Sequence, residues 1–165
     1  MKKLAIFAAA AAVASGPAMA APGDTATAQG AATAEVVAPI TLTHQTGAAL
    51  DFGTFTTGTN GGTVTVDLTG TGVATADVTL IGGSVEAADL FDVAGDASRS
   101  FAISTTPGSV SNGTDTMDFT TSAPASASLN ASGAASFAVG GVLTVAGGES
   151  SGEYTGTYDV TVSYN

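Results

Sequence analysis

The sequence predicts an all-β protein, an antiparallel β-sandwich. Short segments alternate apolar residues with Thr, Ser and Asp, which gives each strand one buried and one solvated face. Gly-rich turn signals separate these segments, and helix signals are nearly absent beyond residue 20. The many Thr residues suit the solvated faces of strands.

The first twenty residues predict a secretory signal peptide. Lys2 and Lys3 precede a short apolar run, Leu4–Ala14, and Ala18–Ala20 offers the small residues of a cleavage site after Ala20. The apolar run is too short for a membrane span, which needs about 20 residues. We therefore expect export through the inner membrane, passage through the periplasm and a final place at the cell surface.

Residues 21–34 form an extension of small residues that has two interpretations. One is a flexible linker. The other is a donor strand that becomes ordered only on a partner sheet, with one face made of Ala26, Ala28, Gly30, Ala32 and Ala34.

The predicted sandwich domain covers residues 35–165. Its first segment, Glu35–Thr43, is rich in β-branched residues, but Pro39 limits it to an edge or a bend. A second segment covers Leu50–Thr56, and Thr59–Gly62 has the composition of a hairpin turn.

Two alternating segments are predicted after this turn. The first places Val64, Val66 and Leu68 on one face, and the second does the same with Val78 and Leu80. The following segment, which starts at Glu86, predicts a single helical turn.

The second half of the domain continues the β pattern. Phe101 and Ile103 share a face, and so do Met117 and Phe119 after a turn at Asn112. Two strand pieces are expected on either side of Gly140 and Gly141. The strongest strand signal is Gly152–Asn165, which we expect to form one interior strand.

The charge balance excludes several partners. The sequence has 14 Asp and Glu against three Lys and Arg, and cleavage after Ala20 leaves Arg99 as the one Lys or Arg. Binding to nucleic acid or to an anionic membrane needs cations that the exported chain lacks. Arg99 is expected to pair with Asp92 or Asp96. Without Cys, the chain has no disulfide, thiol nucleophile or Cys-based metal site.

One catalytic motif is present, but its context argues against an enzyme. Gly148–Gly152 matches G-x-S-x-G around Ser150, yet a strand pattern follows where a nucleophile elbow needs a helix. The single histidine, His44, lies upstream of Ser150 rather than downstream. A Gly/Ser turn explains the motif, and hydrolysis by Ser150 is a remote alternative. No cofactor is expected.

Calcium binding is left open by the sequence. The candidate oxygen ligands are Asp92, Asp96, Asp115 and Asp118. Their spacing does not match an EF-hand loop, so surface acids near turns are the other interpretation. His44 alone cannot form a His-rich metal site.

The C-terminal segment resembles the last strand of chaperone–usher pilus subunits. Those strands alternate apolar residues, carry a penultimate aromatic residue, here Tyr164, and a glycine fourteen places from the end, here Gly152. The segments LDFGTF and GGTVTVDLTG, with the closing strand, also resemble a bacterial exported family catalogued as a domain of unknown function. That family is treated as a fimbrial-type β-sandwich, and the resemblance covers residues 34–165.

The resemblance implies an immunoglobulin-like (pilin-like) antiparallel β-sandwich that lacks its last strand and is completed by donor-strand exchange. A periplasmic chaperone, and then the N-terminal extension of a neighbouring subunit, would complete the sandwich at an outer-membrane usher. The extension at residues 26–34 would be the donor. The implied acceptor residues are Gly152, Tyr158, Val160, Val162 and Tyr164. Two features depart from the pattern. The disulfide of many pilus subunits is absent, and the donor side chains are small, which implies either a shallow groove or a donor that lies elsewhere.

The leading hypothesis is therefore a structural subunit of a bacterial fimbria, with a role in adhesion or biofilm formation. The alternative is a self-complete secreted β-sandwich that binds surfaces or matrix. The two hypotheses differ in whether residues 21–34 are needed for assembly.

Overall fold

A computed structural model describes residue 23, residue 25 and residues 27–165. The chain divides into two units, residues 1–35 and Val36–Asn165. The predicted signal peptide and Ala26 lie outside the described residues. Within the first unit, residues 27–35 are exposed and have no regular secondary structure. Ala28, Gly30, Ala32 and Ala34 are therefore not part of a strand in the free chain.

The second unit is built from antiparallel strands, which confirms the predicted all-β sandwich. No helix occurs among the residues that the structure describes. The strands are β1 (Thr41–His44), β2 (Phe55–Val66), β3 (Gly72–Leu80), β4 (Asp89–Ala94), β5 (Ser100–Thr105), β6 (Gly108–Ser111), β7 (Thr116–Ser122), β8 (Ser126–Ser128), β9 (Ala134–Val145), β10 (Thr155–Thr157) and β11 (Val160–Tyr164).

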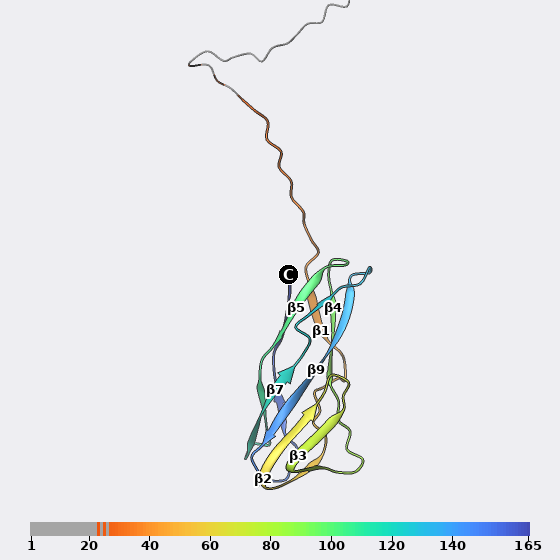
Figure 1. Ribbon diagram of the computed structural model, residues 1–165, viewed down its shortest axis with the longest axis vertical. Helices are drawn as coiled ribbons and strands as arrows, with labels where there is room; N and C mark the ends of the chain where they lie inside the picture. The colour runs from red at the N-terminus through yellow and green to blue at the C-terminus, as the bar shows by residue number, and fades with distance from the viewer. Residues whose placement is uncertain (1–22, 24, 26) are drawn as a thin grey trace, which may run out of the picture. The chain divides into compact units, whose positions relative to one another are not determined.

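The strands form two sheets. The larger sheet has the order β1-β4-β9-β7-β6-β10, with β2 added to β9 and β3 added to β2; the smaller has the order β11-β5-β8. Strand β9 connects the two ends of this unit, since its first half pairs with β4 and its second half pairs with β2 and β7. In Figure 1, β1, β4 and β5 lie toward one end of the unit and β2 and β3 toward the other.

Strand β9 is continuous where two pieces were expected. Gly140 and Gly141 lie at its centre, where the partner strand changes. A Cβ atom at Gly140 would collide with the carbonyl of Val66, and one at Gly141 with the carbonyl of Thr120. The two glycines therefore mark a close approach of neighbouring backbones rather than a turn.

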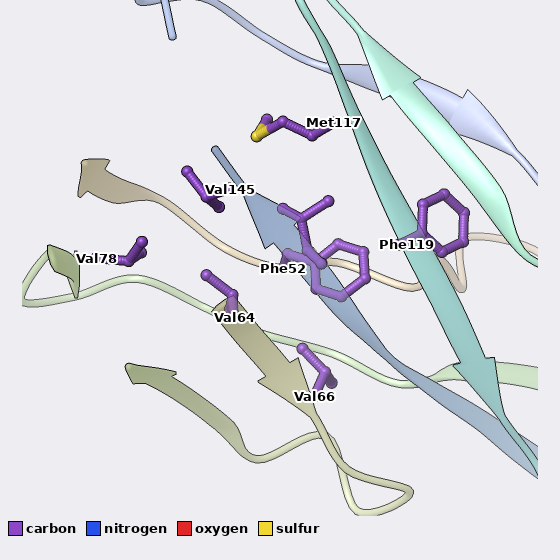
Figure 2. Packing of buried hydrophobic residues seen from close by; sticks show 8 residues of the cluster. Phe52, Val64, Val66, Val78, Met117, Phe119 and Val145 are labelled. Carbon is purple, nitrogen blue, oxygen red and sulfur yellow. The ribbon is translucent and has the colours of Figure 1, made fainter. Parts of the chain in front are cut away.

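The buried side chains fall into two clusters, one in each half of the unit. The first cluster, most of which Figure 2 labels, consists of Phe52, Val64, Val66, Val78, Met117, Phe119, Leu143 and Val145. The second cluster consists of Phe91, Val93, Phe101, Ile103, Leu129, Phe137 and Val139. Most of the predicted inward faces are confirmed, but Leu68 is 41% exposed beyond the end of β2.

Two local predictions are wrong. Thr59–Gly62 is not a hairpin turn but part of a bulge inside β2, where the register with β3 shifts between Thr57 and Gly62. The side chain of Asp77 on β3 stabilises this bulge by accepting hydrogen bonds from Asn60. The segment from Glu86 does not form a helical turn either, because β4 begins at Asp89 and pairs with β9.

The C-terminal segment is also not one interior strand. It splits into β10, which pairs with β6 in the larger sheet, and β11, which pairs with β5 in the smaller one. Each of the two lies at the edge of its sheet. The strands that they pair with, β6 and β5, are consecutive in the chain and also cross from one sheet to the other. The two segments therefore stay paired around a corner.

Backbone contacts hold this corner together. The N–H of Thr106 donates to the carbonyl of Asp159 at 3.0 Å, and the N–H of Asp159 donates to Thr106 Oγ1 at 3.0 Å. Pro107, which follows Thr106, has no N–H to offer a ladder and suits a bend. The alternation of the C-terminal segment predicted its strands, but the corner depends on a partner some fifty residues away in sequence.

Candidate functional site

A groove of about 1450 Å³ runs beside β10 in the second unit. The loop 149–154, β10 and residues 49–57 line it. The floor consists of apolar side chains from three neighbouring strands of the larger sheet, Val110, Met117, Phe119 and Leu143. The first cluster therefore lies directly beneath the groove.

The floor of the groove is already covered. Met117, Phe119 and Leu143 are 4%, 4% and 1% exposed. Phe52 packs on Phe119 at a ring-centroid distance of 5.7 Å, and Tyr158 meets the same ring edge-on at 6.0 Å. Phe119 on the groove floor is therefore covered by aromatic rings of the chain itself.

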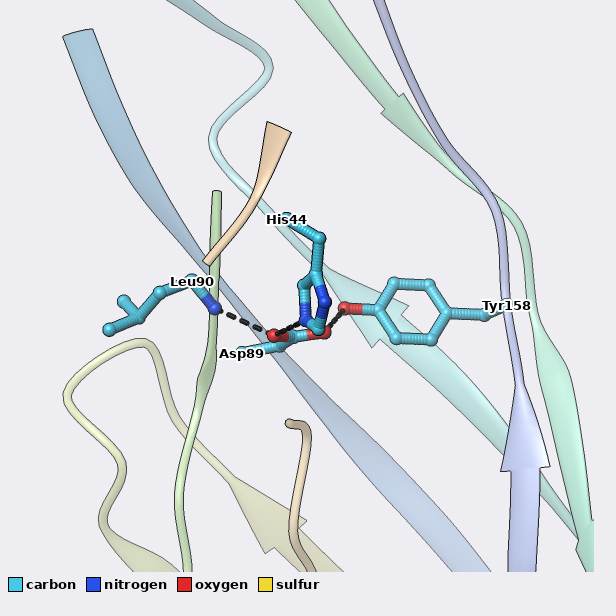
Figure 3. A network of polar contacts seen from close by, with 4 residues as sticks. All are labelled: His44, Asp89, Leu90 and Tyr158. Carbon is cyan, nitrogen blue, oxygen red and sulfur yellow. Dashed lines mark hydrogen bonds and ion pairs between the residues drawn. The ribbon is translucent and has the colours of Figure 1, made fainter. Parts of the chain in front are cut away.

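A polar cluster made of Asp89, His44 and Tyr158 forms one part of the groove lining (Figure 3). Asp89 is 4% exposed, because it shares the inward face of β4 with Phe91 and Val93. Its Oδ1 accepts the N–H of Leu90 at 2.8 Å and lies 2.6 Å from His44 Nε2, and its Oδ2 accepts the Tyr158 hydroxyl at 2.8 Å.

These contacts supply the hydrogen bonds that a buried carboxylate requires. They also act on Tyr158, whose pKa is raised mainly by burial and further by the hydrogen bond and the charge of Asp89. The neutral phenol is therefore the stable form, and it joins the C-terminal segment to β4 across the two sheets. Sequence reasoning missed Asp89, although its parity with Phe91 and Val93 was the available signal.

The predicted acceptor residues divide between two places. Gly152 and Tyr158 line the groove. Val160, Val162 and Tyr164 instead lie half-buried against the second cluster. The Tyr164 hydroxyl donates to the carbonyl of Ala38 at 2.9 Å and accepts the N–H of Asp96 at 2.7 Å.

Ser150, the candidate nucleophile, lies in the loop between β9 and β10. Its hydroxyl donates to Asp115 Oδ2, its N–H donates to the same oxygen at 2.8 Å, and its Oγ accepts Asn112 Nδ2 at 3.1 Å. These bonds lower the pKa of Asp115, with the Ser150 hydroxyl as the largest cause. Their evident effect is to attach the loop to the β6–β7 turn, while His44 is engaged with Asp89.

The candidate calcium ligands have other partners or lie apart. Asp92 accepts Gln45 Nε2 at 2.9 Å, and Asp96, one of the two partners expected for Arg99, accepts Arg99 Nε at 2.7 Å. Asp115 binds Ser150, and Asp118 is exposed on β7. In the part of the chain that the structure describes, no group of three His, Asp or Glu residues is arranged to hold a metal ion.

A search of residues 23, 25 and 27–165 for helices able to cross a bilayer finds none. In comparisons with known proteins, a family model described as a domain of unknown function matches residues 40–164. No curated protein and no solved structure matches the chain.

Proposed function

Since the chain belongs to this family, DUF4402, whose description states no activity, we propose a function from the geometry of the groove. The proposal is that the protein is a structural subunit of a bacterial surface fibre, in which each copy adds a β-strand to the next. The free edge of the C-terminal segment, with the groove beside it, carries this proposal.

The free edge offers the backbone groups that strand addition needs. β10 and β11 each pair with one strand only, so their other edges have no strand partner among the described residues. An unpaired edge of this kind binds an extended peptide through main-chain hydrogen bonds, while alternate side chains enter the groove. All three residues of β10 are exposed to solvent, which supports an edge that an incoming chain can reach.

The proposed occupant is the segment 26–34 of a neighbouring copy. In an extended conformation these nine residues span roughly 30 Å at ~3.3 Å per residue. On this proposal the chain is exported by its signal peptide, a periplasmic chaperone covers the edge before assembly, and an outer-membrane usher presents it to the next subunit.

The test compares the mature chain, residues 21–165, with the same chain lacking residues 21–34. Negative-stain electron microscopy should show fibres only for the longer protein, since the shorter one has no strand to donate. A synthetic peptide of residues 21–35 should bind the shorter protein and raise its melting temperature.

The matched control is a peptide of the same composition in which the small residues no longer alternate, and it should leave the melting temperature unchanged. Fibres formed by the shorter protein would contradict strand addition through this segment. A stable monomer that ignores both peptides would favour the alternative, a self-complete sandwich that binds surfaces or matrix.

A further inference from the structure

We infer that an added strand is paired on both of its sides, with β10 on one side and with the first residues of β2, Phe55–Thr57, on the other. It would close the larger sheet into a barrel around the first cluster. The inference rests on the proposed strand addition and names the edge at which it takes place. The C-terminal segment has two free edges, on β10 and on β11, and their surroundings differ.

The edge of β11 already lies against the other sheet. β11 contacts β1, which is the outermost strand of the larger sheet on that side. The hydroxyl of Tyr164, at the end of β11, donates to the carbonyl of Ala38, three residues before β1, at 2.9 Å. A strand added to β11 would have to compete with this contact.

The edge of β10 borders the groove, and a second unpaired edge borders the same groove. β2 pairs with β9 only over Gly62–Val66, so Phe55–Thr57 pair with β3 alone among the described residues. The carbonyl of Thr54 accepts the N–H of Ile81 on the β3 side at 2.9 Å. By the alternation of an antiparallel pair, Phe55 and Thr57 then direct their N–H and C=O groups away from β3. Phe55–Thr57 and Thr155–Thr157 of β10 both line the groove.

The two edges belong to one curved sheet. The buried strand residues of the first cluster all come from the larger sheet, so this sheet curves around its own core. Phe55 packs against that core from β2, and Tyr154 and Tyr158 pack against it from either side of β10. Four antiparallel steps lead from β2 through β9, β7 and β6 to β10, so β2 and β10 run in the same direction. One strand can therefore pair antiparallel with both and close the sheet as in a small barrel.

The uncharged part of the extension suits this position. The groove volume of about 1450 Å³ exceeds the roughly 300–1,000 Å³ of pockets for small molecules, so it has room for a peptide segment. The exposed carboxylates of Asp51 and Glu153 line the groove and disfavour an acidic strand. Residues 25–34, between Asp24 and Glu35, carry no charge. Residues 27–34 are exposed and have no regular secondary structure, so a neighbouring copy can pair with their backbone.

The experiment forms disulfides between copies of the mature chain, which has no native cysteine. One cysteine replaces each residue from Ala28 to Ala32 in turn. A second is introduced by Thr56→Cys on β2, by Thr157→Cys on β10 or, as the matched control, by Ser163→Cys on β11; all three residues are exposed. A disulfide needs Cα atoms within about 7 Å, so only adjacent strands become linked. After assembly and mild oxidation, non-reducing gels should show ladders of linked copies for Thr56→Cys and Thr157→Cys, and at least tenfold less for Ser163→Cys.

The outcomes separate this inference from the proposed function. Ladders from Ser163→Cys alone, ladders from Thr157→Cys without Thr56→Cys, or fibres without any ladder would overturn the two-sided position and leave strand addition standing. Fibres that persist after deletion of residues 21–34, or the absence of fibres from the unsubstituted mature chain, would overturn both. Each variant is first assembled in reductant; one that fails is replaced by a cysteine two residues earlier, Thr54→Cys, Thr155→Cys or Thr161→Cys, which are also exposed.

Discussion

The two halves of the sandwich bury their apolar residues in different ways. The second cluster lies between two sheets, with β4 and β9 on one side and β5 and the half-buried residues of β11 on the other. The buried strand residues of the first cluster all come from the larger sheet, and a loop residue, Phe52, completes the cluster. The same alternation of residues thus gives a sealed core where a second sheet lies opposite and a groove where a loop takes its place.

The largest expected effect comes from removing one aromatic ring from each half. Phe101 is 0% exposed between the sheets, so Phe101→Ala should lower the free energy of unfolding by about 4 kcal/mol. Phe52→Ala should cost about 2–3 kcal/mol, because its loop can relax and the groove can admit water. Urea denaturation of both variants measures the difference. Equal losses of unfolding free energy, or a larger loss in Phe52→Ala, would contradict the contrast between the halves.

The carboxylate that faces the groove should matter more than a carboxylate on the outer face of the same strand. Asp89→Ala removes the acceptor of three hydrogen bonds and should cost about 2–3 kcal/mol of unfolding free energy. Asp92→Ala, three residues along β4 and exposed, is the matched control and should change stability by less than about 0.5 kcal/mol. Similar losses in the two variants would show that Asp89 contributes no more than a surface residue.

Alkaline pH should weaken the connection between the halves. The pKa of Tyr158 is raised in the folded protein above its ordinary value of 10.0, so its contribution to stability is fully present below pH 10 and is lost as pH rises toward the folded pKa. Thermal melts of the wild type and of Tyr158→Phe between pH 8 and pH 11 measure this. The wild type should lose more stability than the variant over this range, and parallel curves would count against the prediction.

The smallest expected effect concerns the loop 149–154, which lines the groove. In Ser150→Ala the pKa of Asp115 should rise toward its ordinary value of 3.8, because its strongest hydrogen bond is lost. The Asp115–Ser150 contribution to stability is present above that value and disappears as pH falls through the folded pKa. Carboxyl NMR titration reads the pKa of Asp115 directly; an unchanged value in Ser150→Ala would show that the hydroxyl does not set it.

The sequence was sufficient to predict buried faces where the alternation along a single strand decides which residues are buried. Alternation correctly placed Val64 with Val66, Phe101 with Ile103, and Met117 with Phe119 on buried faces. It could not separate the two clusters, because which sheet a strand joins depends on partners far along the chain.

The groove was less predictable than the strands. The resemblance to pilus subunits pointed to Gly152 and Tyr158, which line it, but also to Val160 and Val162, which face the second cluster. Phe52 and Asp89 were not singled out. A buried acid and a buried loop phenylalanine gain their roles from tertiary packing, which a local pattern does not contain.

The corner between β10 and β11 links the two sheets through continuous backbone. Because the segment 100–111 and the C-terminal segment stay paired while they cross from one sheet to the other, both sheets share these two lengths of backbone. Opening of one sheet at this edge strains the hydrogen bonds of the other through Thr106 and Asp159. We therefore expect amide hydrogens on β5 and β6 to exchange together, in the single global unfolding event, although they belong to different sheets.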